Sequence, residues 1–169
     1  SPSKYPYSGK GGYGGTEQIK GMTLLRRPVF VKGATGGKAP QMAYDMIKGK
    51  GSYGKMREDV LNVAVYGGGG DLYGKIFDLL KTYGGDTELT GELNYFRQIA
   101  RGNGFAYAIQ ENIVANTVRS AGYDSVVGYS LRKDGTPFLS EVFDVRESVY
   151  PSKFNPNGKV HQTLLVRED

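Results

Sequence analysis

The sequence predicts an α+β domain in which several short helices are inserted between the strands of a small antiparallel sheet. Three observations predict this class. Residues 105–121 carry a helical stripe, residues 125–145 read as a β-hairpin, and a run of short helices bounded by glycine precedes both. Hydrophobic periods near 3.6 and near 2 distinguish the helices from the strands. The helical run therefore falls between one early strand and the later hairpin.

The helix within residues 105–121 is the best-specified element of the chain. Its stripe follows a period of 3.6. The residues of this stripe are Ile109, Ile113, Val114, Thr117, Val118 and Ala121. Gly122 comes directly after the stripe, at the position where a left-handed helix cap costs glycine least. The helix is therefore expected to end at Gly122.

Two strands and a tight turn are expected after this helix. Residues 125–130 form a short β-branched and aromatic run, as a strand should. Asp134-Gly135 supplies the positive φ angles that a tight hairpin turn needs. Residues 138–145 are then the return strand.

The first strand is predicted at residues 22–32, with Pro28 at a sheet edge or at the start of the strand proper. The following loop, residues 33–38, has the composition of a phosphate-binding loop. The Walker spacing is one residue short, and Ala39 stands where the motif needs a hydroxyl side chain. The sequence therefore favours a glycine turn between a strand and a helix.

Four helices are expected before residues 105–145, and one strand after them. The helices are predicted at residues 40–48, at 57–66, from 72 onward and at 93–100, and the strand at 159–167. Asp71 is the expected N-cap of the third helix. Residues 21–169 are predicted to form a single domain. Residues 1–20, rich in Gly, Tyr and Lys, are predicted to be an arm that lies on the surface or on a partner, or is disordered.

Composition excludes several classes of site. The chain has 169 residues, a net charge of +5, no cysteine and one histidine. Thiolate catalysis, disulfides, cysteine metal sites and multi-histidine metal centres are excluded. His161 is expected to be an ordinary strand residue. No apolar window reaches membrane-spanning length, so no membrane partner is expected. Because the chain starts at Ser1, we expect a processed product or a fragment.

The segment formed by residues 105–145 resembles part of a known family. The phrase Arg119-Ser-Ala-Gly-Tyr-Asp-Ser-Val-Val127, followed by a strand with Ser140-Glu-Val-Phe-Asp-Val145, resembles the C-terminal half of the ADP-ribosyltransferase-like domains of phage and mobile-element polyvalent proteins. The resemblance covers roughly residues 24–150, and its specific part is 118–145. It departs from the family pattern in two ways. No His-Gly-Thr motif occurs anywhere in the chain, and Val145 replaces the proline expected after Asp144.

The resemblance implies NAD as the cofactor and a catalytic glutamate on the return strand of the hairpin. Aligning the Val-Phe-Asp phrase places Leu139 at the glutamate position of the active relatives, and Glu141 two residues later on the same predicted face. Glu141 is the candidate catalytic carboxylate, provided that a bulge or register change moves it. Arg27 is the candidate ligand on the first strand. Tyr123 or Tyr129 is the candidate nicotinamide platform.

Structural alternatives exist for each of these candidates. Glu141 could be a solvent-facing strand residue opposite Arg132 or Lys133, where an exposed ion pair stabilises by only a few tenths of a kcal/mol (~0.3). Tyr123 and Tyr129 could be core or cap residues.

Three functions remain open at this point. The first is an enzyme that transfers ADP-ribose from NAD to a protein or nucleic-acid target. The second is a non-catalytic structural or packaged component of a phage particle or mobile element, with the arm contacting neighbouring subunits. The third is a basic nucleic-acid-binding module, in which arm tyrosines stack on bases beside Lys4 and Lys10. The first two place the chain in a virion or in the host cytoplasm.

Overall fold

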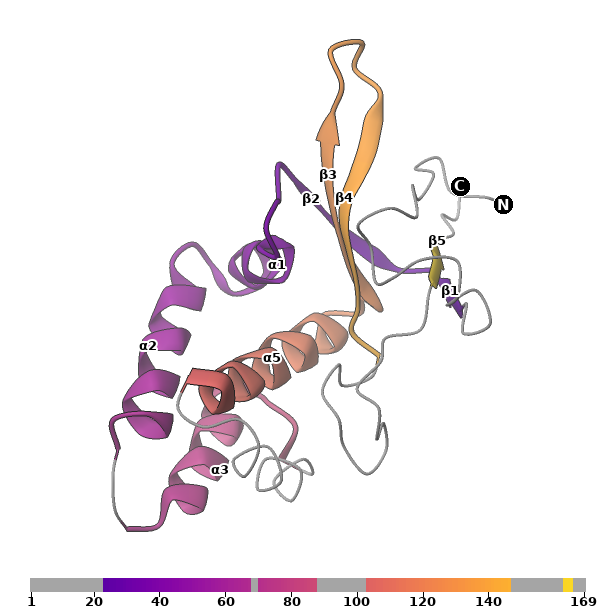
Figure 1. The fold of residues 1–169 in the computed structure, drawn as a ribbon. Helices are drawn as coiled ribbons and strands as arrows, with labels where there is room; N and C mark the ends of the chain where they lie inside the picture. The colour runs from indigo at the N-terminus through magenta and orange to yellow at the C-terminus, as the bar shows by residue number, and fades with distance from the viewer. Residues whose placement is uncertain (1–22, 68–69, 88–102, 147–162, 166–169) are drawn as a thin grey trace.

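A computed structural model describes residues 23–67, 70–87, 103–146 and 163–165. These residues confirm the α+β class (Figure 1). The described helices are α1 (Ala39–Lys48), α2 (Ser52–Ala64), α3 (Leu72–Tyr83) and α5 (Asn103–Ser120). The described strands are β1 (Thr23–Leu25), β2 (Pro28–Lys32), β3 (Ser125–Leu131), β4 (Pro137–Asp144) and β5 (Thr163–Leu165).

The main sheet has three strands in the order β2-β3-β4 and is mixed rather than antiparallel. The β3–β4 hairpin is antiparallel, as expected. The β2–β3 pair is parallel, so the prediction of a purely antiparallel sheet is wrong for this pair. The physical reason is the helical run between the two strands. The helices carry the chain back to the edge of the sheet at which β2 starts, so β3 starts at the same edge and runs parallel to β2.

The early strand is also divided. Residues 23–25 form β1, which pairs in parallel with β5, and the strand of the main sheet begins only at Pro28. Arg26 and Arg27 separate the two strands, so the predicted continuous strand over residues 22–32 is wrong. Pro28 lies at the start of β2, which is one of the two positions expected for it.

The starts and ends of the helices follow their capping residues. The Asp71 side chain accepts a hydrogen bond from the Gly74 N–H at 3.0 Å, which confirms it as the N-cap of α3. Helix α2 begins at Ser52 instead of residue 57, because Gly49 and Gly51 adopt positive φ and make a short turn that ends α1 and starts α2. The predicted arm, the helix at 93–100 and His161 lie outside the described residues, as does most of the last strand.

The core lies between the helices and one face of the main sheet. The predicted stripe of α5 is confirmed as far as Val118, since Ile109, Ile113 and Val118 are fully buried beside Val29 and Val126 of the sheet. Its last predicted member, Ala121, lies beyond the end of the helix and is exposed. The opposite face of the sheet carries a smaller cluster. Its members are Leu25, Val127, Val142, Phe30 and Leu139. No helix in the described part of the chain combines the length and the apolar character needed to span a membrane.

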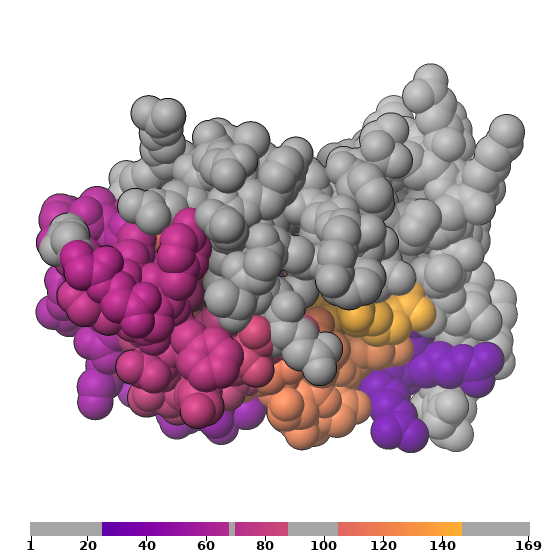
Figure 2. All heavy atoms as spheres, turned by 90° about the horizontal axis from the view of Figure 1, so that it is seen from below, coloured from indigo at the N-terminus to yellow at the C-terminus, as the bar shows by residue number. Residues whose placement is uncertain are grey.

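The figures show how these parts are arranged. In Figure 1 the helices lie on one side of the sheet, and the turn end of the β3–β4 hairpin projects beyond them. Figure 2, seen from below, shows the magenta helical residues on one side and indigo residues from the start of the described chain on the other. Orange residues lie between them, where the chain passes from α5 into the hairpin. This passage is therefore the place where the helices and the strands meet.

Helices α2 and α3 are joined by a hydrogen bond from the Tyr83 hydroxyl to the Asp59 carboxylate. Burial, this hydrogen bond and the negative charge of Asp59 raise the pKa of Tyr83 to about 12. The folded state therefore holds the phenolic proton more tightly than the unfolded state, whose tyrosine pKa is about 10. Stability from this group is complete below about pH 10 and is lost as the pH rises toward about 12.

We accordingly expect Tyr83→Phe to flatten the loss of unfolding free energy in this alkaline window, measured by denaturant titration at several pH values. Asp59→Asn, which keeps the phenol and removes the carboxylate, should bring the pKa of Tyr83 back toward its ordinary value. An unchanged pH dependence in both variants would show that the pair does not link the two helices as described.

Candidate functional site

The Ala-Gly-Tyr-Asp phrase forms the passage from α5 to β3. Helix α5 ends at Ser120, and Gly122 takes a φ of 96°. The Tyr123 N–H donates to the Val118 carbonyl at 3.2 Å, which closes the end of the helix. The glycine is needed because this φ is left-handed. Asp124 is thereby placed just before the first residue of β3.

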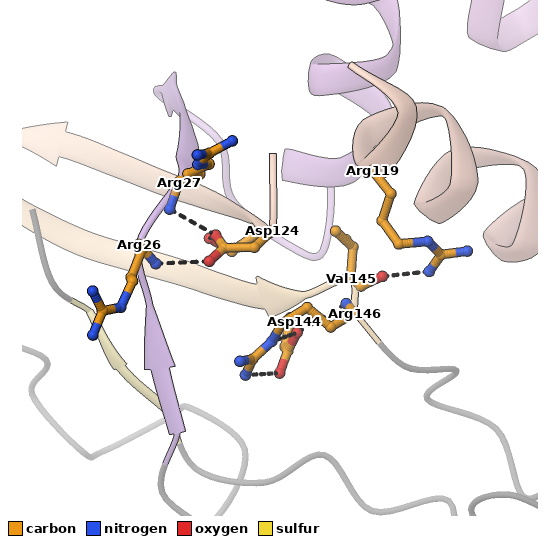
Figure 3. Close-up of polar contacts among 8 residues, drawn as sticks. Arg26, Arg27, Arg119, Asp124, Asp144, Val145 and Arg146 are labelled. Atoms are coloured by element: carbon orange, nitrogen blue, oxygen red, sulfur yellow. Dashed lines mark hydrogen bonds and ion pairs between the residues drawn. The ribbon is translucent and has the colours of Figure 1, made fainter. Parts of the chain in front are cut away.

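The Asp124 carboxylate joins this passage to the start of β2 (Figure 3). One oxygen accepts the Arg26 main-chain N–H at 2.7 Å, and the other accepts the Arg27 main-chain N–H at 3.0 Å and the Ser125 hydroxyl at 2.8 Å. The Asp124 N–H in turn donates to the Arg27 carbonyl at 3.0 Å. These contacts hold the bend between β1 and β2 beside the start of β3. We call this group the Asp124 junction.

The end of β4 is bound to the same junction. The Val145 N–H donates to the Asp124 carbonyl at 3.1 Å, and the Arg119 guanidinium donates to the Val145 carbonyl. Arg119 also donates to the Asn116 side chain at 3.3 Å. Burial lowers the pKa of Arg119, while the charge of Asp86 acts in the opposite direction. The last turn of α5 therefore holds the strand that leaves the sheet.

Two of the proposed NAD-binding residues lie at this junction. Arg27 contributes its main-chain N–H and carbonyl to the Asp124 contacts, and its side chain is exposed. Tyr123 is exposed at the end of α5 and uses its main chain to close the helix. Arg27 thus has a structural role in the junction, and Tyr123 has one at the end of α5.

The proposed catalytic residue, Glu141, lies beside a β-bulge. Gly128 pairs with Glu141, and Tyr129 pairs with Leu139, so Ser140 is the extra residue of β4. A bulge reverses the alternation of side chains beyond it. Leu139 accordingly packs in the small cluster on one face, whereas Glu141 contacts α1 on the other face. The expectation that Leu139 and Glu141 share a face is therefore wrong.

The Glu141 carboxylate caps the start of helix α1. One oxygen accepts the Gly37 N–H, and the other accepts the Ala39 N–H at 3.0 Å. Lys38, the N-cap residue itself, makes no capping hydrogen bond with its side chain. A carboxylate is favourable here because a helix start carries unpaired N–H groups and a positive partial charge. The strand thus supplies the cap that the sequence next to α1 lacks.

The loop before α1 is held close to the sheet by the same bulge. The Ser140 hydroxyl donates to the Ala34 carbonyl at 2.6 Å, and the Gly33 N–H donates to the Tyr129 carbonyl at 2.7 Å. Gly36 and Gly37 both take positive φ. The expectation of a glycine turn between strand and helix is confirmed. This loop is in direct contact with Glu141. In the sheet Glu141 lies opposite Gly128, and not opposite Arg132 or Lys133.

The fourth candidate, Tyr129, lies on the face of the sheet opposite Glu141. Its ring meets Phe30 edge to face, with centroids 6.2 Å apart and an interplanar angle of 80°. Along β2 and β3 the register runs from Pro28 beside Ser125 to Lys32 beside Tyr129. Four residues of parallel strand span about 13 Å. Tyr129 is therefore well separated along the sheet from the Asp124 junction.

The described residues thus place the candidates at three positions. Arg27 belongs to the Asp124 junction and Tyr123 directly precedes it, Tyr129 lies on one face of the sheet, and Glu141 lies on the other face at the start of α1. The sequence interpretation gave no role to Asp124, whose carboxylate accepts the main-chain N–H groups of Arg26 and Arg27 from a distant segment. An aspartate between a helix-ending glycine and a strand indicates that its carboxylate binds main-chain N–H groups, but local patterns do not indicate that these groups belong to residues 26 and 27.

No cluster of three or more histidine or acidic side chains able to hold a metal ion occurs within the described ranges. Comparisons of the chain with models of protein families, with curated proteins and with solved structures find no match. The relation to ADP-ribosyltransferase-like domains therefore stays a prediction from the sequence.

Proposed function

We propose that this chain is an ADP-ribosyltransferase-like domain that serves as a non-catalytic component of a phage particle or mobile element. The fold type is supported by the order of the elements. A first strand is followed by helices, and α5 then leads through the Asp124 junction into the β3–β4 hairpin. This is the order that the resemblance implies.

The absence of catalysis is supported by one observation, the position of the Glu141 carboxylate. An ADP-ribosyltransferase needs a carboxylate that can reach the nicotinamide ribose and stabilise positive charge as nicotinamide leaves. In this chain both oxygens of Glu141 accept main-chain N–H groups at the start of α1. The aligned position on the opposite face is occupied by Leu139, which has no charge to offer.

An active enzyme would need these groups to rearrange. Glu141 would have to leave α1, and NAD would have to meet Arg27 and a tyrosine that lie elsewhere on the sheet. Transfer of ADP-ribose from NAD to a macromolecular target is therefore the less supported alternative. Residues 1–20 are the proposed contact with neighbouring subunits in the non-catalytic assembly.

The test compares NAD binding and turnover with stability in three proteins: the wild type, Glu141→Gln and Glu58→Gln. Glu58 is exposed on α2 and serves as a matched control. We expect no heat of NAD binding at millimolar concentration and no release of nicotinamide from any of the three. Glu141→Gln should lower the free energy of unfolding by about 1–2 kcal/mol, because it weakens a charged cap. The control should change it by less than about 0.5 kcal/mol.

The opposite outcome is equally distinct. Nicotinamide release by the wild type that Glu141→Gln loses and Glu58→Gln keeps would overturn the proposal and establish the transferase.

Sedimentation of the wild type tests the assembly half of the proposal. A protein that stays a monodisperse monomer at every concentration, alone and with extracts of assembled particles, would contradict a role as an assembly component.

A further inference from the structure

The turn between α1 and α2 carries a dense group of positive charges. Lys48, Lys50, Lys55 and Arg57 are all exposed, and no acidic residue occurs from 46 to 57. We call these four residues the basic turn. In Figure 1 this connection lies at the outer edge of the helical side, away from the projecting hairpin. All four side chains are exposed, and the parts of the chain that carry them, α1, α2 and the turn between them, take no part in the Asp124 junction.

The backbone of the turn brings these cations to one corner of the molecule. Gly49 and Gly51 take φ values of 113° and 84°, and the Ser52 N–H donates to the Gly49 carbonyl at 3.1 Å. The Ser52 hydroxyl donates to the Lys48 carbonyl at 3.1 Å. The end of α1 and the start of α2 are thus held together, with three of the cations in or after the turn.

These cations are not paired with acidic side chains in the described ranges, although Asp45 lies one helical turn before Lys48 and Glu58 follows Arg57 directly. Asp45 is engaged through one oxygen by the Tyr53 main-chain N–H at 2.8 Å. None of the four cations forms an ion pair with another residue of the described ranges. Lys55 lies in the first turn of α2, which contains no acidic residue. This position is unfavourable for Lys55, because a cation near a helix start is repelled by the helix dipole. Only Lys48, in the last turn of α1, gains from its position.

We propose that the basic turn binds the phosphate backbone of a nucleic acid. A regular array of phosphates matches several cations presented within a short segment, and Lys and Arg are the usual phosphate partners. Gly49, Gly51 and Gly54 lie between the cations, so the main chain leaves room for a close approach of the strand. Met56 is fully buried, whereas Met46, two residues before Lys48, is exposed, so the vesicle measurement below is needed to separate a nucleic acid from a membrane surface. Because the proposed contacts go to phosphates, we expect binding that depends little on base sequence.

The test measures the binding of fluorescently labelled single-stranded and duplex oligonucleotides by anisotropy over a range of salt concentrations. The full chain is compared with the triple variant Lys48→Gln/Lys50→Gln/Lys55→Gln. The matched control is Lys32→Gln/Lys75→Gln/Lys133→Gln, in which three other exposed lysines are replaced and the net charge changes equally. Circular dichroism and thermal unfolding check that both variants remain folded.

We expect the triple variant of the basic turn to lose about tenfold in affinity, and the dependence of log K on log salt to become shallower by about 2, since each phosphate contact contributes about 0.7–0.9 to that slope. The control should stay within about twofold of the wild type, as expected for charges that do not touch the strand. Equal losses in the two variants would overturn the proposal in favour of diffuse attraction by net charge. Loss of binding on Lys4→Gln/Lys10→Gln, with the basic turn variant unaffected, would assign the contact to the arm instead. Binding of the wild type to phosphatidylserine vesicles but to neither oligonucleotide would also overturn it.

Discussion

Replacing Asp124 with alanine should lower the free energy of unfolding by about 3 kcal/mol, because one carboxylate holds two main-chain N–H groups and one hydroxyl. The acceptors of Arg26, Arg27 and Ser125 would all be lost together. Ser125 is fully buried, so its hydroxyl could not turn to water for a replacement. Urea unfolding followed by circular dichroism measures the change. The junction joins β2, β3 and the end of β4, so the loss should appear as one cooperative shift.

A neighbouring aspartate provides the matched control. Asp144 lies directly across the sheet from Ser125, but its carboxylate binds Arg146, two residues along the chain, at 2.7 Å. Such a local and partly exposed ion pair contributes less than about 1 kcal/mol, so Asp144→Ala should have a small effect. Asp124→Asn, which keeps one acceptor oxygen, should fall between the two. Equal effects of Asp124→Ala and Asp144→Ala would show that the junction does not hold the strands together.

The elements that could be predicted from sequence are those with local causes. The stripe of α5, the Asp71 cap and the hairpin turn each depend on residues a few positions apart. In the turn, Gly135 has a φ of 86°, and Asp134 accepts the Thr136 N–H at 2.9 Å. Hydrogen bonds from Thr136 lower the pKa of Asp134, so the carboxylate stays charged while it holds the turn. Such signals are complete within a short window of sequence.

The candidate site could not be predicted in the same way, because its contacts join distant segments. Asp124 and Arg26 are 98 positions apart, and Glu141 and Ala39 are 102 positions apart. A polar residue on the return strand is visible from the sequence, but the bulge at Ser140 decides which face it occupies. The parallel direction of β2 depends likewise on where the helical run returns the chain. Local patterns identified Glu141 as a residue of interest and left its partner undetermined.

Gly128→Val should lower the free energy of unfolding by about 2–3 kcal/mol, although valine is the better strand former. A Cβ at Gly128 would lie 3.1 Å from the Ala34 Cβ, 3.2 Å from the Ser140 Oγ and 3.3 Å from the Ala39 Cβ. Two of these neighbours are short alanine side chains close to the main chain, so they cannot move without moving the loop. The extra methyl groups of valine would push the loop and the start of α1 away from β3.

Ser130→Val is the control for this prediction, since Ser130 follows Gly128 by two positions on the same strand face and is only partly buried. It should change the free energy of unfolding by less than about 0.5 kcal/mol. Gly128→Val should also speed the hydrogen exchange of the Gly37 and Ala39 amides, which bind Glu141 in the wild type, and Glu141→Gln should have the same effect. If Gly128→Val destabilises the fold while these two amides stay protected, the close approach of the loop and the capping by Glu141 are independent. If both amides lose protection in both variants, the absence of a side chain at Gly128 is what allows Glu141 to reach α1.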